Sequence, residues 1–261
     1  MRLTLVGGPT VLIEAAGWRI LTDPTFDPPG RRYRFGWGTS STKTVGPAVA
    51  AADLLPVDLV LLSHDHHADN LDVAGRQLLH EDQRVVTTRP GARRLGTSAR
   101  GLRPWESLDL DARGLPTLHV TATPARHGPP LSRPVAGAVV GFVLSWPDVG
   151  GGRVWVTGDT VLFDGAREVL RRFTVDVAIV HLGGVRFPLT GRTRYSMVVA
   201  DAVDLLGPDP PRVVVPVHHD GWSHFGESGP ALQRAIEEAG PTLRSRVLLL
   251  SPGTATQVPP R

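Results

Sequence analysis

Short apolar or alternating runs recur along the whole chain and constrain its fold more than any other feature of the sequence. About ten such runs are present, among them "RLTLV", "VDLVLLS", "RVWVTGD", "RVVVPVH" and, at residues 246–252, "RVLLLSP". Runs of this length, rich in Val, Ile and Leu and bounded by Gly, Pro or Asp, are typical of β-strands. The sequence therefore predicts a protein built on β-sheets.

Helical periodicity appears between the strand runs, over residues 71–81, 165–173, 196–207 and 229–240. Gly207 and Gly240 end the last two segments in the manner of helix C-caps. The order of strands followed by a helix repeats after about residue 130. A chain of 261 residues with this order favours a single α/β (α+β) domain of two similar halves, roughly 1–130 and 131–261, packed sheet to sheet with helices outside.

Composition excludes several classes of protein. A hydrophobic content of 41% and a charged content of 20% are typical of a globular protein and argue against disorder. No stretch of 18 apolar residues predicts a membrane span, and the N-terminus has a strand pattern unlike a signal peptide, so we expect a cytoplasmic protein. The net charge of +3, without runs of like charge, argues against a nucleic-acid partner. The oligomeric state stays open.

Four separated segments place metal-binding residue types directly after predicted strands. They are "SHDHHADN", with His64, His66, His67 and Asp69; "ARHGPP", with His127; "TGDT", with Asp159; and "PVHH", with His218 and His219. The chain has no cysteine, so histidine and carboxylates are its only strong metal ligands. Because loops that follow strands can converge on one edge of a pair of sheets, these segments predict a metal site.

These motifs resemble those of the metallo-β-lactamase-fold hydrolases, and most closely the sugar-lactonase-like and N-acyl-phosphatidylethanolamine phospholipase D-like branch. "GGPTVLIEAAGWRILTDPTF" resembles the opening of that branch, and "LLSHDHHADNLD" resembles the family's His-x-His-x-Asp-His loop. The resemblance covers nearly the whole chain and implies a four-layer αββα sandwich of two mixed sheets. It also implies one or two metal ions, usually zinc, bound by His64, His66, His67, Asp69, His127, Asp159 and His218.

The ligand loop is one residue longer than the family's pattern, and two registers fit it. Counting from His64 makes His66 the second ligand and leaves the family's aspartate unmatched. Counting back from "NLD" makes His67 the second histidine and Asp69 the aspartate, with Asn70 in place of the third histidine. We favour the second register with His64 still a ligand, and the role of His66 stays open. Because an amide is a neutral and weaker ligand, the second site is expected to be loose, empty or suited to Mn²⁺ or Mg²⁺.

The resemblance implies a reaction in which metal-bound hydroxide hydrolyses an ester, lactone or phosphodiester bond of a small molecule. Asp69 would ligate the second metal or accept a proton from the attacking water. Asp23 in "LTDP" would hold one of the metal-ligating imidazoles in place without itself binding the metal. The candidate substrate-binding residues are Arg32, Arg34, Trp37, Arg194 and His219. Because arginine forks suit carboxylates and phosphates, they favour an anionic substrate.

Two other functions stay open. Asn70 suggests a metal-binding family member with reduced or lost catalysis, acting as a sensor or scaffold. A nucleic-acid-processing hydrolase of the same fold is the other, and the modest charge argues against it.

Two further histidines and one long segment lie outside these motifs. His181 is expected to be a hydrogen-bonded core residue and His224 a loop residue near the rim. The aromatic residues of the long segment 23–47 favour an ordered flap, and whether residues 24–47 form a lid stays open.

Overall fold

The strand runs form two large sheets in the computed structural model, which describes residues 1–80, 82–96, 98–130, 132, 136–149, 152–227 and 229–259. The first sheet has seven strands in the order β15 (Ala255–Gln257), β1 (Arg2–Gly7), β2 (Thr10–Ala15), β3 (Trp18–Thr22), β6 (Leu59–Leu61), β7 (Val85–Thr88) and β8 (Ala99–Leu102). The second has six in the order β14 (Val213–Val217), β13 (Val177–His181), β12 (Val154–Val156), β11 (Val140–Ser145), β10 (Leu118–Pro124) and β9 (Ser107–Leu110).

Both sheets are mixed. In the first, β15, β1, β2 and β3 pair antiparallel, and β3, β6, β7 and β8 pair parallel. In the second, β9, β10, β11 and β12 pair antiparallel, and β12, β13 and β14 pair parallel. The parallel strands β6, β12, β13 and β14 are nearly continuous apolar runs, as expected where helices cover the outer face of a sheet.

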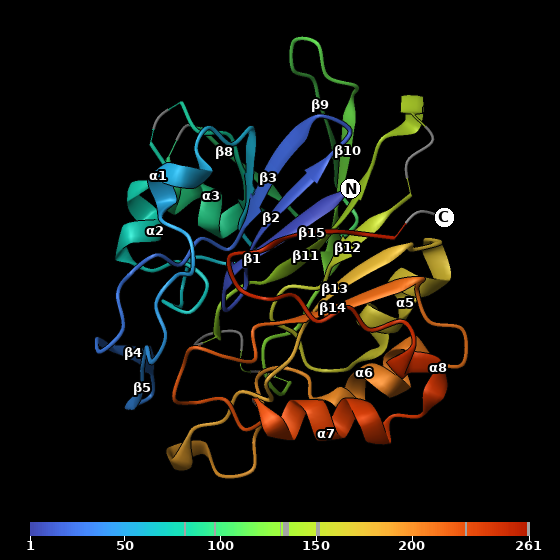
Figure 1. Cartoon of the computed structure of the whole chain (residues 1–261). Helices are drawn as coiled ribbons and strands as arrows, with labels where there is room; N and C mark the ends of the chain where they lie inside the picture. Colours follow the sequence, from blue (N-terminus) through green and yellow to red (C-terminus); the bar gives the residue numbers. More distant parts are fainter. Residues whose placement is uncertain are drawn as a thin grey trace.

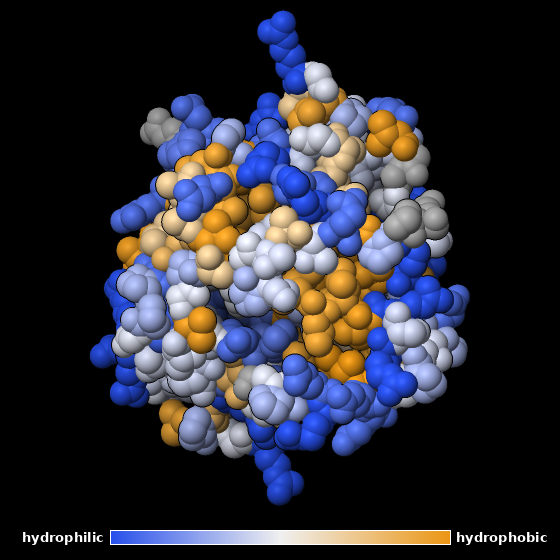
Figure 2. Space-filling model, viewed as in Figure 1, coloured by the Kyte–Doolittle hydropathy of each residue, from blue (hydrophilic) through white to orange (hydrophobic). Residues whose placement is uncertain are grey.

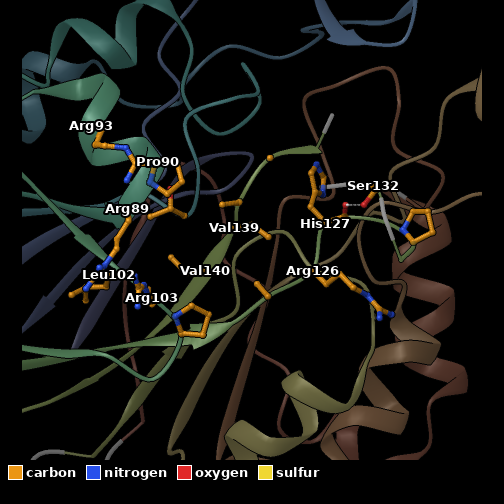
Figure 3. Close-up of a pocket in the computed structure, with 16 residues that line it drawn as sticks. Arg89, Pro90, Arg93, Leu102, Arg103, Arg126, His127, Ser132, Val139 and Val140 are labelled. Carbon is orange, nitrogen blue, oxygen red and sulfur yellow. Dashed lines mark hydrogen bonds between the residues drawn. The ribbon is translucent and has the colours of Figure 1, made fainter. Parts of the chain in front are cut away.

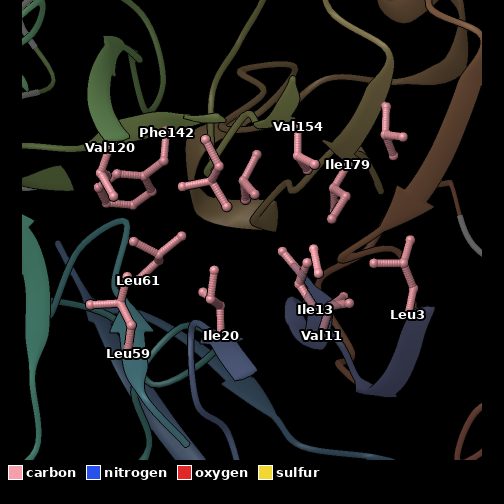
Figure 4. Close-up of a cluster of buried hydrophobic side chains, with 14 of the residues drawn as sticks. Leu3, Val11, Ile13, Ile20, Leu59, Leu61, Val120, Phe142, Val154 and Ile179 are labelled. Atoms are coloured by element: carbon pink, nitrogen blue, oxygen red, sulfur yellow. The ribbon is translucent and has the colours of Figure 1, made fainter. Parts of the chain in front are cut away.

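The main hydrophobic core lies between the two sheets. Figure 4 shows Ile13, Ile20 and Leu61 of the first sheet facing Phe142 and Ile179 of the second. All five side chains are buried. Alternate residues of each strand therefore fill the space between the sheets, and the residues between them face the helices.

The helices form the two outer layers (Figure 1). On the first sheet these are α1 (Ala51–Leu54), α2 (Val73–Gln77) and α3 (Arg89–Leu95), and on the second α5 (Asp164–Arg172), α6 (Val199–Leu206), α7 (Pro230–Glu238) and α8 (Pro241–Arg244). Short 3₁₀ turns occupy Pro147–Val149 and Pro188–Thr190. The expected αββα sandwich is confirmed. The surface seen from this side is mixed, with separate apolar patches among hydrophilic residues (Figure 2).

Several elements differ from the sequence-based expectation. The run 246–252 forms no strand and makes a single bridge from Val247 to Val214, while the last strand is β15. The expected helix over 71–81 is shortened to α2, because Asp72 caps it and the chain turns after Gln77. The sheets also do not divide the chain at residue 130, since β9 and β10 belong to the second sheet and β15 to the first. None of the described helices is long and apolar enough to cross a membrane.

The long segment 23–47 is ordered and carries a two-stranded hairpin, β4 (Arg32–Gly36) and β5 (Thr39–Thr42). Its base is fixed by Asp72, whose carboxylate accepts hydrogen bonds from the backbone N–H groups of Phe26 at 2.9 Å and Asp27 at 2.7 Å. Lys43, the only lysine, donates to the same carboxylate at 2.8 Å. Both partners of this ion pair are buried. Asp72 therefore ties the hairpin segment to α2.

We expect Asp72→Ala to lower the free energy of unfolding by about 3–5 kcal/mol, because it leaves the Lys43 ammonium buried without a partner. The same change removes the side-chain cap of α2. Urea unfolding against the parent protein measures the loss, with Asp53→Ala in α1 as the control because Asp53 is exposed. Equal losses in the two variants would contradict this role for the buried pair.

Candidate metal centre

The loops that follow four strands bring six buried side chains together at one edge of the sheets. They are His64, His67 and Asp69 after β6, His127 after β10, Asp159 after β12 and His218 after β14. Parallel strands end at the same edge of a sheet, which places Asp159 beside His218. The six residues form two groups of three, each with one ligand atom per residue within 4.8 Å of the others.

The first group, here called the trihistidine group, consists of His64, His67 and His127. His67 Nδ1 lies 3.3 Å from His64 Nε2 and 3.0 Å from His127 Nε2. His127 Nδ1 donates to the Tyr195 carbonyl at 2.7 Å, so the lone pair of the neutral ring is on Nε2. His64 Nδ1 lies 3.0 Å from the Ser63 hydroxyl. Imidazoles held in this way, by a partner on the opposite ring nitrogen, are typical of metal ligands.

The second group, here called the carboxylate group, consists of Asp69, Asp159 and His218. His218 Nδ1 lies 3.1 Å from Asp159 Oδ1, and His218 Nε2 lies 3.4 Å from Asp69 Oδ2. Asp159 also approaches the trihistidine group, with Oδ2 4.0 Å from His127 Nδ1. Asp159 therefore lies against the imidazole of one member of the trihistidine group, on the ring nitrogen that also faces Tyr195.

Backbone geometry fixes the ligand loops closely. Asp23, buried and with a positive φ of 32°, accepts a hydrogen bond from the Ser63 backbone N–H at 2.7 Å, directly before His64. Its other oxygen lies 3.4 Å from His181 Nε2. Gly158, directly before Asp159, has a φ of 63°, and a Cβ there would lie 2.6 Å from the Val140 carbonyl oxygen. Only glycine fits this turn without displacing the strand beside it.

Burial sets the electrostatics of the site. Burial lowers the pKa of His67 to about 3 and that of His218 to about 4, so both imidazoles are neutral at pH 7. Burial and the neighbouring Asp69 raise the pKa of Asp159 well above its usual value. Burial also opposes the ionisation of Asp69, but the contacts from His218 and His224 outweigh it and hold the pKa of that carboxyl low. The site thus holds neutral imidazoles beside an ionised carboxylate.

These shifts predict that the metal-free protein loses stability as the pH falls below about 6.5. Below that pH the unfolded chain protonates its histidines while the folded chain keeps His67 neutral, so the unfolded state binds more protons and is favoured. Between pH 6.5 and pH 5, one imidazole that stays neutral in the folded state lowers the free energy of unfolding by about 2 kcal/mol. Urea unfolding of chelated protein measures it, and His67→Gln should show a shallower dependence on pH. An unchanged dependence, matching that of the exposed control His80→Gln, would contradict the assignment.

His66 lies outside both groups. Its side chain is 29% exposed, and Nδ1 lies 3.4 Å from Arg94 Nη2 and 3.6 Å from Asp65 Oδ1. Arg94 is in turn held by both oxygens of Asp65, at 2.6 and 2.7 Å. In this loop His67, and not His66, faces His64 and His127, as in the second of the two registers.

Among the predicted substrate-binding residues, Trp37 shares a cavity with residues of both groups. The cavity has a volume of about 20 Å³, and His67, Asp69 and His127 line it together with Phe35, Phe187 and Tyr195. This volume suffices for about one water molecule. Arg32 and Arg34 instead line a separate hollow on the hairpin. Arg194 lies 3.5 Å from Asp201, and His219 is partly buried beside His218.

A larger cavity of about 640 Å³ also has His127 in its wall. Figure 3 shows Arg89, Arg93 and Arg103 on the side opposite His127 and Ser132. Arg89 binds Glu106 at 2.7 Å, and Arg93 has no carboxylate partner among the described residues. The cationic wall near the site is therefore formed by arginines that the sequence did not single out.

His224 also lies beside the carboxylate group, although the sequence placed it in a loop near the rim of the site. Its side chain is 1% exposed, and Nε2 lies 3.2 Å from Asp69 Oδ2. Tyr195 was missed as well, although its carbonyl orients His127. The signal available for His224 was its place in "GWSHF", only six residues after His218 in the same loop.

The donor atoms of the site fit a metal ion. Buried polar atoms without a hydrogen-bond partner in the described chain include Asp69 Oδ1, both oxygens of Asp159, and both ring nitrogens of His218 and His224. Buried carboxylates and imidazoles left without partners are costly, whereas a divalent cation satisfies them together. Nitrogen and carboxylate oxygen donors in such numbers suit zinc and related transition metals.

A four-layer αββα sandwich with histidine and aspartate groups at one sheet edge defines a metallohydrolase of the metallo-β-lactamase fold. The chain belongs to the beta-lactamase superfamily, because the model of the beta-lactamase superfamily domain matches residues 18–219. It is 28% identical over 272 residues to a UPF0173 metal-dependent hydrolase of Methanoregula boonei, covering 100% of this chain and 99% of the relative. It is 30% identical over 230 residues to another of Opitutus terrae, covering 84% of each. The protein is thus a metal-dependent hydrolase.

Solved structures share the fold along the whole chain. An isothiocyanate hydrolase from Delia radicum gut bacteria matches with a TM-score of 0.82 at 22% identity, covering 99% of each chain. A possible metal-dependent hydrolase from Veillonella parvula matches with a TM-score of 0.83 at 19% identity, also covering 99% of each. Similarity at this level of identity concerns the fold alone.

Proposed function

We propose that the protein is a zinc-dependent hydrolase of a small anionic ester, lactone or phosphodiester. The observation that carries this proposal is the convergence of His64 Nε2, His67 Nδ1 and His127 Nε2, with contacts of 3.0–3.3 Å. At most one of two facing neutral nitrogens donates a proton to the other, so three facing nitrogens are best satisfied by a cation. The trihistidine group would hold one ion and the carboxylate group a second.

Zinc held by His64, His67 and His127 would supply an activated water with a pKa near 7 and would polarise the bond to be cleaved. The protein's own residues orient the reaction. Asp69 Oδ2 faces His218 and His224, which leaves Oδ1, buried without a hydrogen-bond partner, to accept a proton. The apolar rings of Phe35 and Phe187 line the same cavity as Asp69.

The arginines of the larger cavity support an anionic substrate. Arg93 and Arg103 lie across this cavity from His127, and guanidinium groups bind carboxylates and phosphates through paired hydrogen bonds. This placement differs from the initial expectation, which assigned the anion to arginines such as Arg34 on the hairpin.

We expect Arg93→Gln to raise KM for an anionic ester by roughly tenfold, the loss of one hydrogen bond to a charged group, and to leave KM for a neutral ester unchanged. Steady-state kinetics on the matched esters measure both values. Arg113→Gln is the control, since Arg113 is exposed and lies outside the residues that line the cavity. An effect confined to Arg34→Gln would place the anion at the hairpin instead.

The experiment that tests the proposed function combines elemental analysis with a substrate panel on protein purified without a metal-affinity tag. Zinc, with turnover of an anionic ester, lactone or phosphodiester, is the expected result. A neutral aryl isothiocyanate belongs in the panel, because a solved structure with this fold is an isothiocyanate hydrolase. Preference for it would overturn the anionic assignment, and bound metal without any turnover would favour a sensor or scaffold. Turnover of RNA or DNA alone would favour the nucleic-acid alternative.

A further inference from the structure

The carboxylate group has one imidazole, and the position where the family resemblance implies another is occupied by Asn70. The Asn70 side chain turns toward the start of its own loop, where Nδ2 donates to the Ser63 hydroxyl at 3.2 Å. Ser63 in turn lies against His64 Nδ1. Asn70 is thus engaged in supporting the trihistidine group, and only its Oδ1 remains without a partner.

His224 reaches the carboxylate group from a different loop. Its Nε2 lies 3.2 Å from Asp69 Oδ2, and the Nε2 of His218 lies 3.4 Å from the same oxygen. Neither ring nitrogen of His224 has a hydrogen-bond partner in the described part of the chain. A buried imidazole without partners is unfavourable unless something satisfies it. One carboxylate oxygen of Asp69 therefore faces two imidazoles, those of His218 and His224.

The surroundings of His224 hold the ring in place. It stacks on Trp222 at an interplanar angle of 22° and meets Phe35 and Phe187 at centroid distances of 5.1 and 5.4 Å. The His224 carbonyl accepts a hydrogen bond from the Arg186 backbone N–H at 3.1 Å. Rigid packing of this kind prepares a side chain for binding, because little conformational freedom remains to be lost.

We propose that His224 is a ligand of the second metal ion, together with Asp69, Asp159 and His218, and takes the role of the histidine that Asn70 replaces. This inference rests on the proposed metal-dependent function. It changes the expected properties of the second site, because a nitrogen donor in place of an amide favours zinc over Mg²⁺. A hydrogen bond from His224 to Asp69 without metal ligation is the competing role.

Zinc titration of chelated protein, by calorimetry with elemental analysis, separates these roles. We expect the parent to bind two ions and His224→Ala to bind one, with the affinity of the second site lowered more than about 100-fold, beyond the loss typical of an outer-sphere residue. His224→Gln, which keeps a polar side chain of similar size, should lose the same ion. Asn70→His in the His224→Ala background should restore two ions, and His66→Ala should keep two.

The outcomes distinguish this inference from the proposed function. Two ions of unchanged affinity in His224→Ala and His224→Gln would overturn the ligand role and leave His224 as a positioning residue for Asp69. One ion in the parent would overturn the inference and leave a mononuclear hydrolase. No zinc binding in the parent would overturn the proposed function as well. Circular dichroism of each variant identifies any loss that comes from unfolding.

Discussion

Replacing His67 by alanine is expected to lower kcat/KM by more than about 100-fold, because losing a metal ligand exceeds the 10- to 100-fold cost of losing an outer-sphere residue. His67 Nδ1 is the nitrogen that both His64 and His127 face. His66→Ala is expected to change kcat/KM by less than about fivefold, since His66 lies beside Arg94 and outside both groups. Each variant removes one imidazole, and the two positions are neighbours in the chain, so their comparison isolates the effect of facing the trihistidine group.

Steady-state kinetics at saturating zinc measure both variants. Circular dichroism and thermal melting show whether each is folded. Equal losses, or a larger loss in His66→Ala, would restore the register in which His66 is the second ligand.

Removal of the metal by a chelator is expected to abolish activity and to lower Tm by about 10 °C. A ligand that binds only the folded state at a thousand times its Kd adds about 4 kcal/mol, and each kcal/mol shifts Tm by about 2–4 °C in a protein of this size. The buried carboxylates of Asp69 and Asp159 then face each other without a cation.

Scanning calorimetry before and after chelation measures the shift, and added zinc should restore both Tm and activity. His127→Ala serves as the matched variant, because its Tm should respond much less to chelation. A chelated protein with unchanged Tm and full turnover would contradict a metal-dependent centre.

The sequence predicted much of the fold because its strands are buried on both faces. Runs such as 177–180 and 213–217 are apolar throughout and form most of β13 and all of β14. The hairpin strands β4 and β5 were missed because they mix arginine, glycine and serine and gain their order from tertiary contacts such as Lys43 with Asp72. The prediction of a strand over residues 246–252 was wrong, because apolar content alone does not supply a neighbouring strand to pair with.

The candidate site was predicted in part. Residues that directly follow strands, such as His127, Asp159 and His218, could be placed together because strand ends fix their position. The register of the ligand loop could not be decided, because His66 and His67 are neighbours and only the backbone path selects which one turns inward. His224 and Arg93 were not anticipated, because they reach the site through loop and helix packing between distant segments.

X-ray diffraction from zinc-soaked crystals, recorded at the zinc absorption edge, shows directly whether the two groups bind metal. We expect one anomalous peak among His64 Nε2, His67 Nδ1 and His127 Nε2, and a second beside Asp69 and Asp159. Zinc peaks found only at surface histidines such as His80, with none between His64 and His127, would contradict this expectation.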